Sequence, residues 1–378
     1  MTGNTVAELI HDWPDLSRPW RDGTYLRGRA QAAVTSPLTR EAWKYSQLPR
    51  FVSALAALPT LAEPRIEGLD QPGVRLRALD ELDDATAREL SAHLNATDNQ
   101  RHVLADLSLL RASGGWLLDI DASLPSPLLV RYPDAGITPL FVRLAANVSA
   151  ELHERCDGAA SLAQITQVAL ARGAQLAHHR SALDGSAQHW ALLDVTLADS
   201  SRYCLELAQC GGVQRRSEIQ VRLSGRGAEA ELRGAYLIEA GTHLDQQLTV
   251  EHLGSDGTSR QTFHGIGAGR GRSIFNGRIH IHPHAPRTNA ELSNRNLALD
   301  SAAEMNTKPE LEIYTDDVRC AHGATVGQLA QDSLFYLASR GIDLAAARTL
   351  LCRGFLAECL QGPLAQESLQ RFMGALPQ

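Results

Sequence analysis

A thiol and an imidazole lie two residues apart late in the chain, at Cys320 and His322, where a strand-rich region gives way to a helical one. Successive side chains of an extended strand point to opposite faces, so residues i and i+2 share a face and can reach the same ion. Thiolate and imidazole are both iron and zinc ligands. The spacing alone also fits ordinary packing, because cysteine is often buried and histidine often half-buried.

The residues around this pair resemble the signature of the SufB/SufD family of iron-sulfur assembly scaffolds. In that family a segment of the form KPELEI-x-x-DDV-x-C-x-HGAT-x-G precedes an LFYL-x-SRGI helix, and residues 308–327 and 334–342 supply both here. Weaker matches run through the chain, at EAWKY (41–45), at Gly211 and Gly212 with Arg215 or Arg216, and at FNGRI (275–279).

The resemblance implies a non-catalytic scaffold subunit of the SUF iron-sulfur cluster assembly complex. Family members pair with SufB and dock the ATPase SufC, whose nucleotide cycle opens the scaffold interface. A transient iron-sulfur cluster, shared with SufB, is then built at the subunit interface, with His322 as the assembly residue and Cys320 as a further metal ligand. The family also implies a reduced flavin in the assembled complex, although these residues contain no flavin fingerprint. Whether the isolated chain forms a homodimer stays open.

The last part of the chain returns to helical periodicity, with Asp343 as an expected N-cap for a helix over residues 344–360. An apolar stripe on such helices is ordinarily core. The resemblance implies instead a SufC-docking surface, formed by Leu334, Phe335, Tyr336, Arg340, Gly341 and Phe355.

Composition excludes several classes of partner. The 378 residues are 44% apolar, enough for a large core, and 36 basic against 43 acidic side chains give a net charge of -7, so nucleic acid is not an expected partner. No stretch reaches the roughly 18 apolar residues of a membrane span, and the first residues lack the pattern of a signal peptide. We therefore expect a cytoplasmic protein. Six scattered cysteines include no CxxC pair of the kind found in zinc ribbons or thioredoxin-like motifs, and the lack of a four-cysteine ferredoxin spacing argues against a permanently held cluster.

Enzymatic alternatives find less support in the residues. The only two lysines, Lys44 and Lys308, do not follow glycine, so an ATP-binding P-loop is excluded. A β-helix enzyme acting on polysaccharides would use clustered carboxylates, but Asp245, Glu229 and Glu231 show no repeated spacing. A structural assembly protein, in which Cys320 and His322 merely pack, is the remaining alternative.

Two histidine groups lie outside the signature. His280, His282 and His284 alternate along a predicted strand as metal ligands do, although Pro283 disrupts strand pairing, and their role stays open. The adjacent His178 and His179 fit a solvated loop.

Periodicity divides the chain into an N-terminal mainly helical region (1–115), a strand-rich core (116–322) and a C-terminal helical domain (323–378). Within the core, residues 159–172 have helical spacing and predict a helix or an irregular loop. Short strands with glycine-rich breaks by themselves favour a sandwich or barrel.

The resemblance implies a different arrangement, a mainly β fold whose core is a right-handed parallel β-helix. At about 20 to 25 residues per coil, residues 190–320 would hold five or six coils. The segment 285–290 departs from the family pattern by including Pro286, which predicts a reshaped turn.

Overall fold

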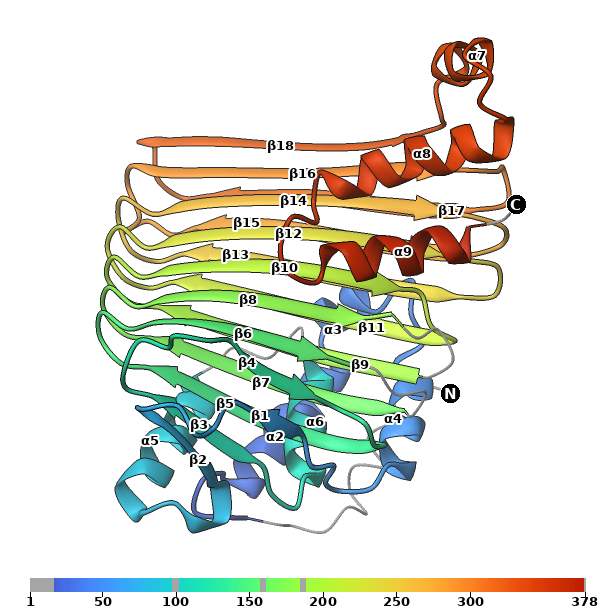
Figure 1. Cartoon of the computed structure of the whole chain (residues 1–378). Coiled ribbons are helices and arrows are strands. Elements are labelled where there is room, and N and C mark those ends of the chain that lie inside the picture. The colour runs from blue at the N-terminus through green and yellow to red at the C-terminus, as the bar shows by residue number, and fades with distance from the viewer. Residues whose placement is uncertain (1–16, 97–101, 157–160, 184–187, 377–378) are drawn as a thin grey trace.

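The computed structural model describes residues 17–96, 102–156, 161–183 and 188–376, and its core is a parallel β-solenoid of about eight turns (Figure 1). The signal-peptide expectation falls on residues outside the described ones. One sheet contains, in spatial order, β1 (Arg65–Glu67), β4 (Leu128–Arg131), β6 (Ser149–Arg155), β8 (Gln175–Ala182), β10 (Arg202–Cys210), β12 (Glu229–Ile238), β14 (Thr258–Gly267), β16 (Thr288–Ala298) and β18 (Val318–Gly327).

The second sheet faces the first across the interior of the solenoid. Its strands, in spatial order, are β17 (Glu304–Ile313), β15 (Arg272–Ile281), β13 (His243–His252), β11 (Gln214–Leu223), β9 (Gln188–Leu197), β7 (Leu162–Leu170), β5 (Gly136–Leu144), β3 (Trp116–Ile120) and β2 (Val74–Ala78). Among the strands of the described residues, only β1 and β2, at the first end of the stack, pair antiparallel to their neighbours.

The mainly β fold and the parallel β-helix are confirmed, and the coil length is corrected. Arg202 pairs with Gln175 on one side and Glu229 on the other, so one coil takes 27 residues, and Val318 pairs with Thr288, 30 residues earlier. Residues 190–320 therefore hold five coils, each longer than expected. The helix or loop expected over residues 159–172 is wrong, because β7 occupies Leu162–Leu170; residues 159 and 160 lie outside the described ones.

The core fills the space between the two sheets. Alternate side chains of each strand point inward and stack on their equivalents in the next coil, as Leu193, Val195 and Leu197 of β9 do on Ile219, Val221 and Leu223 of β11. Each such side chain is at most 2% exposed. Full burial of a side chain of this size contributes about 1.5–3 kcal/mol, so the stacked columns hold the coils together.

The same backbone conformation recurs at one corner of the solenoid in successive coils. At this corner one residue takes a positive φ, and its N–H donates to a carbonyl of the next coil. The position is held in turn by Asn147, Gly173, Ser200, Gly227, Asp256 and Arg287. Because Arg287 follows Pro286 and keeps this geometry at φ 59°, the turn over 285–290 is built like the others, contrary to the expected reshaping.

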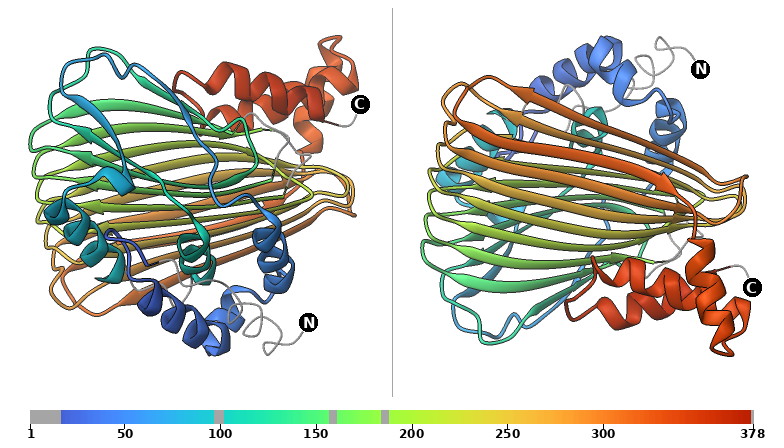
Figure 2. Two further views of the ribbon diagram at one scale, coloured as in Figure 1. Left: turned by 90° about the horizontal axis from the view of Figure 1, so that it is seen from below. Right: turned by 90° about the horizontal axis from the view of Figure 1, so that it is seen from above.

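Helices cover the outer faces of the two sheets on opposite sides of the stack (Figure 2). The N-terminal group lies over the second sheet and contains α2 (Gly23–Thr35), α3 (Pro37–Ala42), α4 (Leu48–Ala57), the 3-10 turn η1 (Leu79–Glu81), α5 (Asp84–Ala96) and α6 (Val103–Arg111). The C-terminal helices are α7 (Gln331–Ser339), α8 (Leu344–Ala357) and α9 (Ala365–Ala375), of which α8 and α9 lie on the first sheet. As predicted, Asp343 caps α8, accepting from the Ala346 N–H.

Candidate functional site

Cys320 and His322 lie on β18, the last strand of its sheet. They pair in register with Ala290 and Leu292 of β16, whose side chains are buried in the interior, so both predicted site residues share the inward face of the final coil. No further coil covers them among the described residues. Consequently Cys320 is only half-buried against the core and His322 is exposed.

The two side chains differ in chemical readiness. Burial raises the pKa of the Cys320 thiol, and the N–H of Ala290 only partly offsets this, so the thiol form dominates near neutral pH. His322 makes no hydrogen bond or ion pair with any described residue, which leaves its ring nitrogens accessible. Asp316 and Asp317 lie in the bend before β18 instead of forming a carboxylate pair.

Segments that matched the family weakly come together on the outer face of the second sheet. The Arg216 guanidinium lies 3.7 Å from the centre of the Trp43 ring and donates to Glu218 and Asp245 at 2.6 and 2.5 Å. The final coil joins the same helical layer, because Lys308 contacts Glu41 at 3.1 Å. The EAWKY segment thus links the middle of the solenoid to its last coil.

The residues expected to dock an ATPase divide into two groups. Leu334 is buried, and Phe355 stacks on the His264 ring with centroids 4.4 Å apart, so both serve the packing of the C-terminal helices. At the surface lie Phe335 (77% exposed), Tyr336 (56% exposed), Arg340, whose guanidinium covers the Tyr336 ring, and Gly341 at φ +83°. In Figure 1, α7 projects beyond the body of the solenoid.

The predicted histidine run is only partly brought together. The rings of His280 and His282 stack with centroids 4.0 Å apart, and Glu251 completes a group whose ligand atoms lie within 4.8 Å of one another. His284 is exposed and lies outside this group. A guanidinium nitrogen of Arg278 lies 3.3 Å from His280 Nδ1, and this positive charge opposes a metal ion there.

The solvated loop expected at His178 and His179 is wrong, because both lie in β8 and are buried. His178 points inward and contacts Glu154 at 2.9 Å and the Tyr203 hydroxyl at 2.8 Å. Burial alone would raise the pKa of Glu154, but Arg180 and His178 hold it well below its ordinary value. The prediction of a loop did not anticipate this network, because both faces of β8 are covered by other parts of the chain.

The carboxylates weighed for a polysaccharide-active enzyme do not converge. Asp245 is buried beneath the N-terminal helices, where it accepts from Arg216 and from the Ser46 hydroxyl. Glu229 and Glu231 lie on another strand of the opposite sheet. The three therefore do not form a catalytic carboxylate pair.

The fold defines a helix-flanked parallel β-solenoid that carries a Cys-x-His pair on the last strand of one sheet. Comparison with known families agrees with this class of protein. Residues 134–355 match the family described as SUF system FeS cluster assembly, SufBD core domain, so the chain belongs to the SufBD family of iron-sulfur cluster assembly proteins.

Individual relatives extend the same finding. The chain is 33% identical over 213 residues to the iron-sulfur cluster assembly protein SufD of Escherichia coli, covering 55% of this chain and 50% of that one. It is 34% identical over 203 residues to a SufBD family protein of Synechocystis (53% and 45%), and 35% identical over 174 residues to one of Mycobacterium leprae (44% and 44%). The matches thus span about half the length of these relatives. No described helix has the length and apolar character needed to cross a membrane.

Proposed function

We propose that this chain is the scaffold subunit that pairs with SufB and docks the ATPase SufC, so that a nascent iron-sulfur cluster is built at the SufB contact. This proposal depends on one observation: Cys320 and His322 lie together on β18, a strand at the edge of its sheet. A cluster formed there would be cargo, bound by this chain on one side only.

The open end of the solenoid suits a protein partner. Both strands of the final coil, β17 and β18, are edge strands with one unpaired backbone side. Such edges take up a partner strand or must be protected from aggregation. Apolar side chains are exposed on the same coil, with Tyr314 59% and Val326 49% accessible. A Cβ added at Gly323 would meet nothing within 4 Å, so packing within this chain does not require glycine there.

The chemistry of the pair fits temporary binding. One imidazole and one thiol supply at most two ligands, whereas cluster iron is held by thiolate or imidazole ligands that usually number four per cluster. The remaining ligands must come from the partner, and separating the subunits would release the cluster. His322 is the more available ligand, because Cys320 is half-buried and largely protonated.

The ATPase contact is assigned to the exposed face of α7. Phe335 and Tyr336 are large aromatic side chains that few contacts within this chain hold, and buried aromatic anchors supply most of the binding energy at many interfaces. Leu334, on the same helix, is buried.

The test replaces His322 in cells that lack the native chain and carry both partners. His322→Ala should co-purify with SufB and SufC but yield complexes without acid-labile sulfide, and iron-sulfur enzymes of the cell should stay inactive. Cys320→Ser should reduce both readouts less. Arg319→Ala, an exposed change on the opposite face of the same strand, is the matched control. Normal cluster maturation by His322→Ala would refute the assignment.

A further inference from the structure

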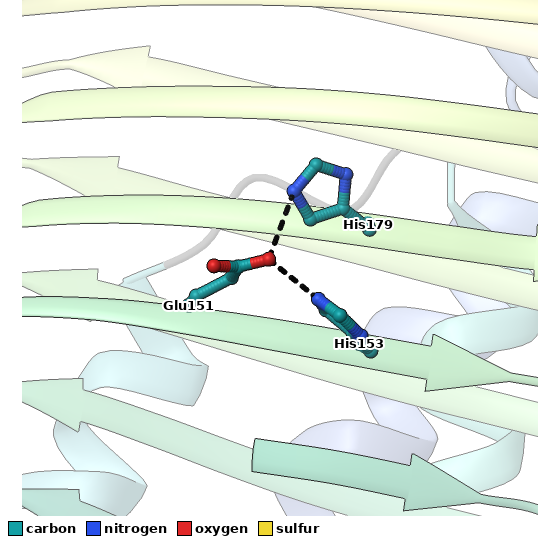
Figure 3. A group of neighbouring side chains, drawn as sticks. All are labelled: Glu151, His153 and His179. Carbon is teal, nitrogen blue, oxygen red and sulfur yellow. Dashed lines mark hydrogen bonds and ion pairs between the residues drawn. The ribbon is translucent and has the colours of Figure 1, made fainter. Parts of the chain in front are cut away.

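A column of polar side chains runs across three neighbouring coils on the outer face of the first sheet. His153 of β6 pairs in register with His179 of β8, which in turn pairs with Glu206 of β10. Neighbouring strands lie about 4.8 Å apart, so these side chains stack directly beside one another. Glu151 precedes His153 by two residues and shares its outward face (Figure 3).

Three potential metal ligands converge in this column. One carboxylate oxygen of Glu151 lies 2.6 Å from His153 Nε2 and 3.6 Å from His179 Nε2, and the ligand atoms of all three residues lie within 4.8 Å of one another (Figure 3). Ligand atoms around a tetrahedral zinc ion are about 3.3 Å apart, as follows from metal–nitrogen bonds of about 2.0–2.1 Å. The observed separations bracket this value, so small side-chain rotations would complete the geometry.

A buried carboxylate stands behind the ligands. His179 is only 9% exposed, and its Nδ1 has no hydrogen-bond partner among the described residues. Glu206 Oε1 lies 3.8 Å from this nitrogen and likewise has no hydrogen-bond partner among the described residues, while Arg233 lies 3.7 Å from the other carboxylate oxygen. The other oxygen of Glu206 accepts from the N–H groups of Gln361 and Gly362 at 2.8 and 2.7 Å. A metal-bound imidazole commonly donates its second N–H to such a carboxylate.

The loop between α8 and α9 closes over this carboxylate. A Cβ at Gly362 would lie 2.4 Å from the ring of His179, so only glycine allows the loop to come this close. Metal binding at His179 Nε2 would fix the remaining proton on Nδ1, where it can reach Glu206 and satisfy both orphaned atoms. Buried polar atoms without partners are costly, and a metal ion that fixes the proton on Nδ1 would remove this cost for both atoms.

We propose that Glu151, His153 and His179 bind a divalent transition-metal ion such as Zn²⁺ or Fe²⁺, with Glu206 orienting His179. Two imidazoles and one carboxylate on one side of an ion are typical of such metals and leave the outward positions for water. This site stands independently of the proposed scaffold function. In the sheet β8 lies five strands from β18, about 24 Å from Cys320 and His322.

The second histidine group is the weaker candidate. Its imidazole at His280 faces the Arg278 guanidinium, whereas the contacts found for Glu151 and His153 join them to each other and to His179. His280→Ala therefore provides a matched control that removes an imidazole from an outer sheet face.

The experiment titrates the full-length, reduced and chelator-treated chain with Co²⁺ under anaerobic conditions. We expect one site per chain whose absorption shows ligand-field bands without thiolate-to-cobalt charge transfer. His153→Ala should weaken Co²⁺ binding by more than the roughly 10- to 100-fold that loss of an outer-shell partner costs, and Glu206→Gln should fall within that range. Zn²⁺ should compete for the site and raise the thermal unfolding midpoint of the parent chain, because it binds only the folded state.

Glu151→Gln provides a second test if a histidine variant misfolds. Glu151 is partly exposed, and glutamine keeps the shape of the glutamate side chain. It should lose Co²⁺ binding while its unfolding midpoint in chelator matches the parent. His280→Ala and Cys320→Ser should bind Co²⁺ like the parent. Unchanged Co²⁺ affinity in both His153→Ala and Glu151→Gln would overturn the proposal, as would binding that disappears in Cys320→Ser.

Discussion

At the scale of single residues, the buried charges carry more structural weight than the exposed ones. Arg216 is 1% exposed, and its guanidinium contacts two buried carboxylates, Glu218 and Asp245, as well as the Trp43 ring. Removing one member of a buried ion network leaves the others charged and without compensation. Exposed pairs, such as Arg75 with Asp121, remain solvated when broken and contribute little.

Arg216→Met should therefore lower the free energy of unfolding by about 3–5 kcal/mol, because Glu218 and Asp245 would remain buried without their counter-ion. The measurement is urea unfolding at neutral pH. Arg75→Met is the matched control, with an expected loss below about 1 kcal/mol. Equal losses in the two variants would contradict the assigned role of Arg216.

The sequence supports some of these residue placements better than others. That Cys320 and His322 share a face follows from strand periodicity alone, and the structure agrees. The column of His153, His179 and Glu206 could not be anticipated, because it requires the register between coils. That register steps by 26 residues from His153 to His179 and by 27 from there to Glu206, and no strict sequence repeat marks it.

At the scale of elements, burial on both faces explains the error at β7. The segment LAQITQVAL lacks strict alternation because Gln164 hydrogen-bonds inward to Glu154 while Gln167 faces Asp194 on the other side. A strand covered on both faces loses the two-residue period that identifies strands. The corner residues are equally hard to recognise, since a positive φ is adopted there by side chains as different as Asn147 and Arg287.

The helix α7 offers a prediction at this scale. Phe335→Asp should leave the unfolding midpoint nearly unchanged, because an exposed side chain changes stability by only about 0.5 kcal/mol. If α7 docks SufC as proposed, the variant should weaken that binding by about 2 kcal/mol or more, as loss of an aromatic anchor does. Calorimetric titration with the ATPase measures the effect.

Val213→Asp is the matched control for this variant, since Val213 is also an exposed apolar residue but lies outside the C-terminal helices. It should bind SufC like the parent chain. If Phe335→Asp binds SufC with parental affinity, the docking surface does not include the exposed face of α7.

At the scale of the whole molecule, the solenoid differs at its two ends and is polar in parts of its interior. At the first end the edge strands β1 and β2 pair antiparallel to their neighbours, whereas at the last described coil the edge strands β17 and β18 continue the parallel stack. Inside the stack, His178 and His252 are fully buried, and burial lowers the pKa of both imidazoles. The stability of the stack must therefore depend on pH.

The contribution of His252 to the pH dependence of stability can be calculated. Its Nε2 lies 2.8 Å from the Ser259 hydroxyl, and burial lowers its pKa to about 4 from an ordinary 6.5. Below pH 6.5 the unfolded chain takes up a proton that the folded chain does not, so stability is full above that pH and falls until about pH 4. A shift of this size corresponds to about 3 kcal/mol.

His252→Gln removes this titration and should flatten the pH profile. The parent chain should lose about 3 kcal/mol more unfolding free energy than the variant between pH 7 and pH 4, as measured by urea unfolding at each pH. Other buried groups, among them His178 and Glu154, titrate in both proteins and cancel in the difference. If the two pH profiles run parallel, His252 takes up its proton in the folded chain at the same pH as in the unfolded chain. The expected neutral, buried imidazole would then be wrong.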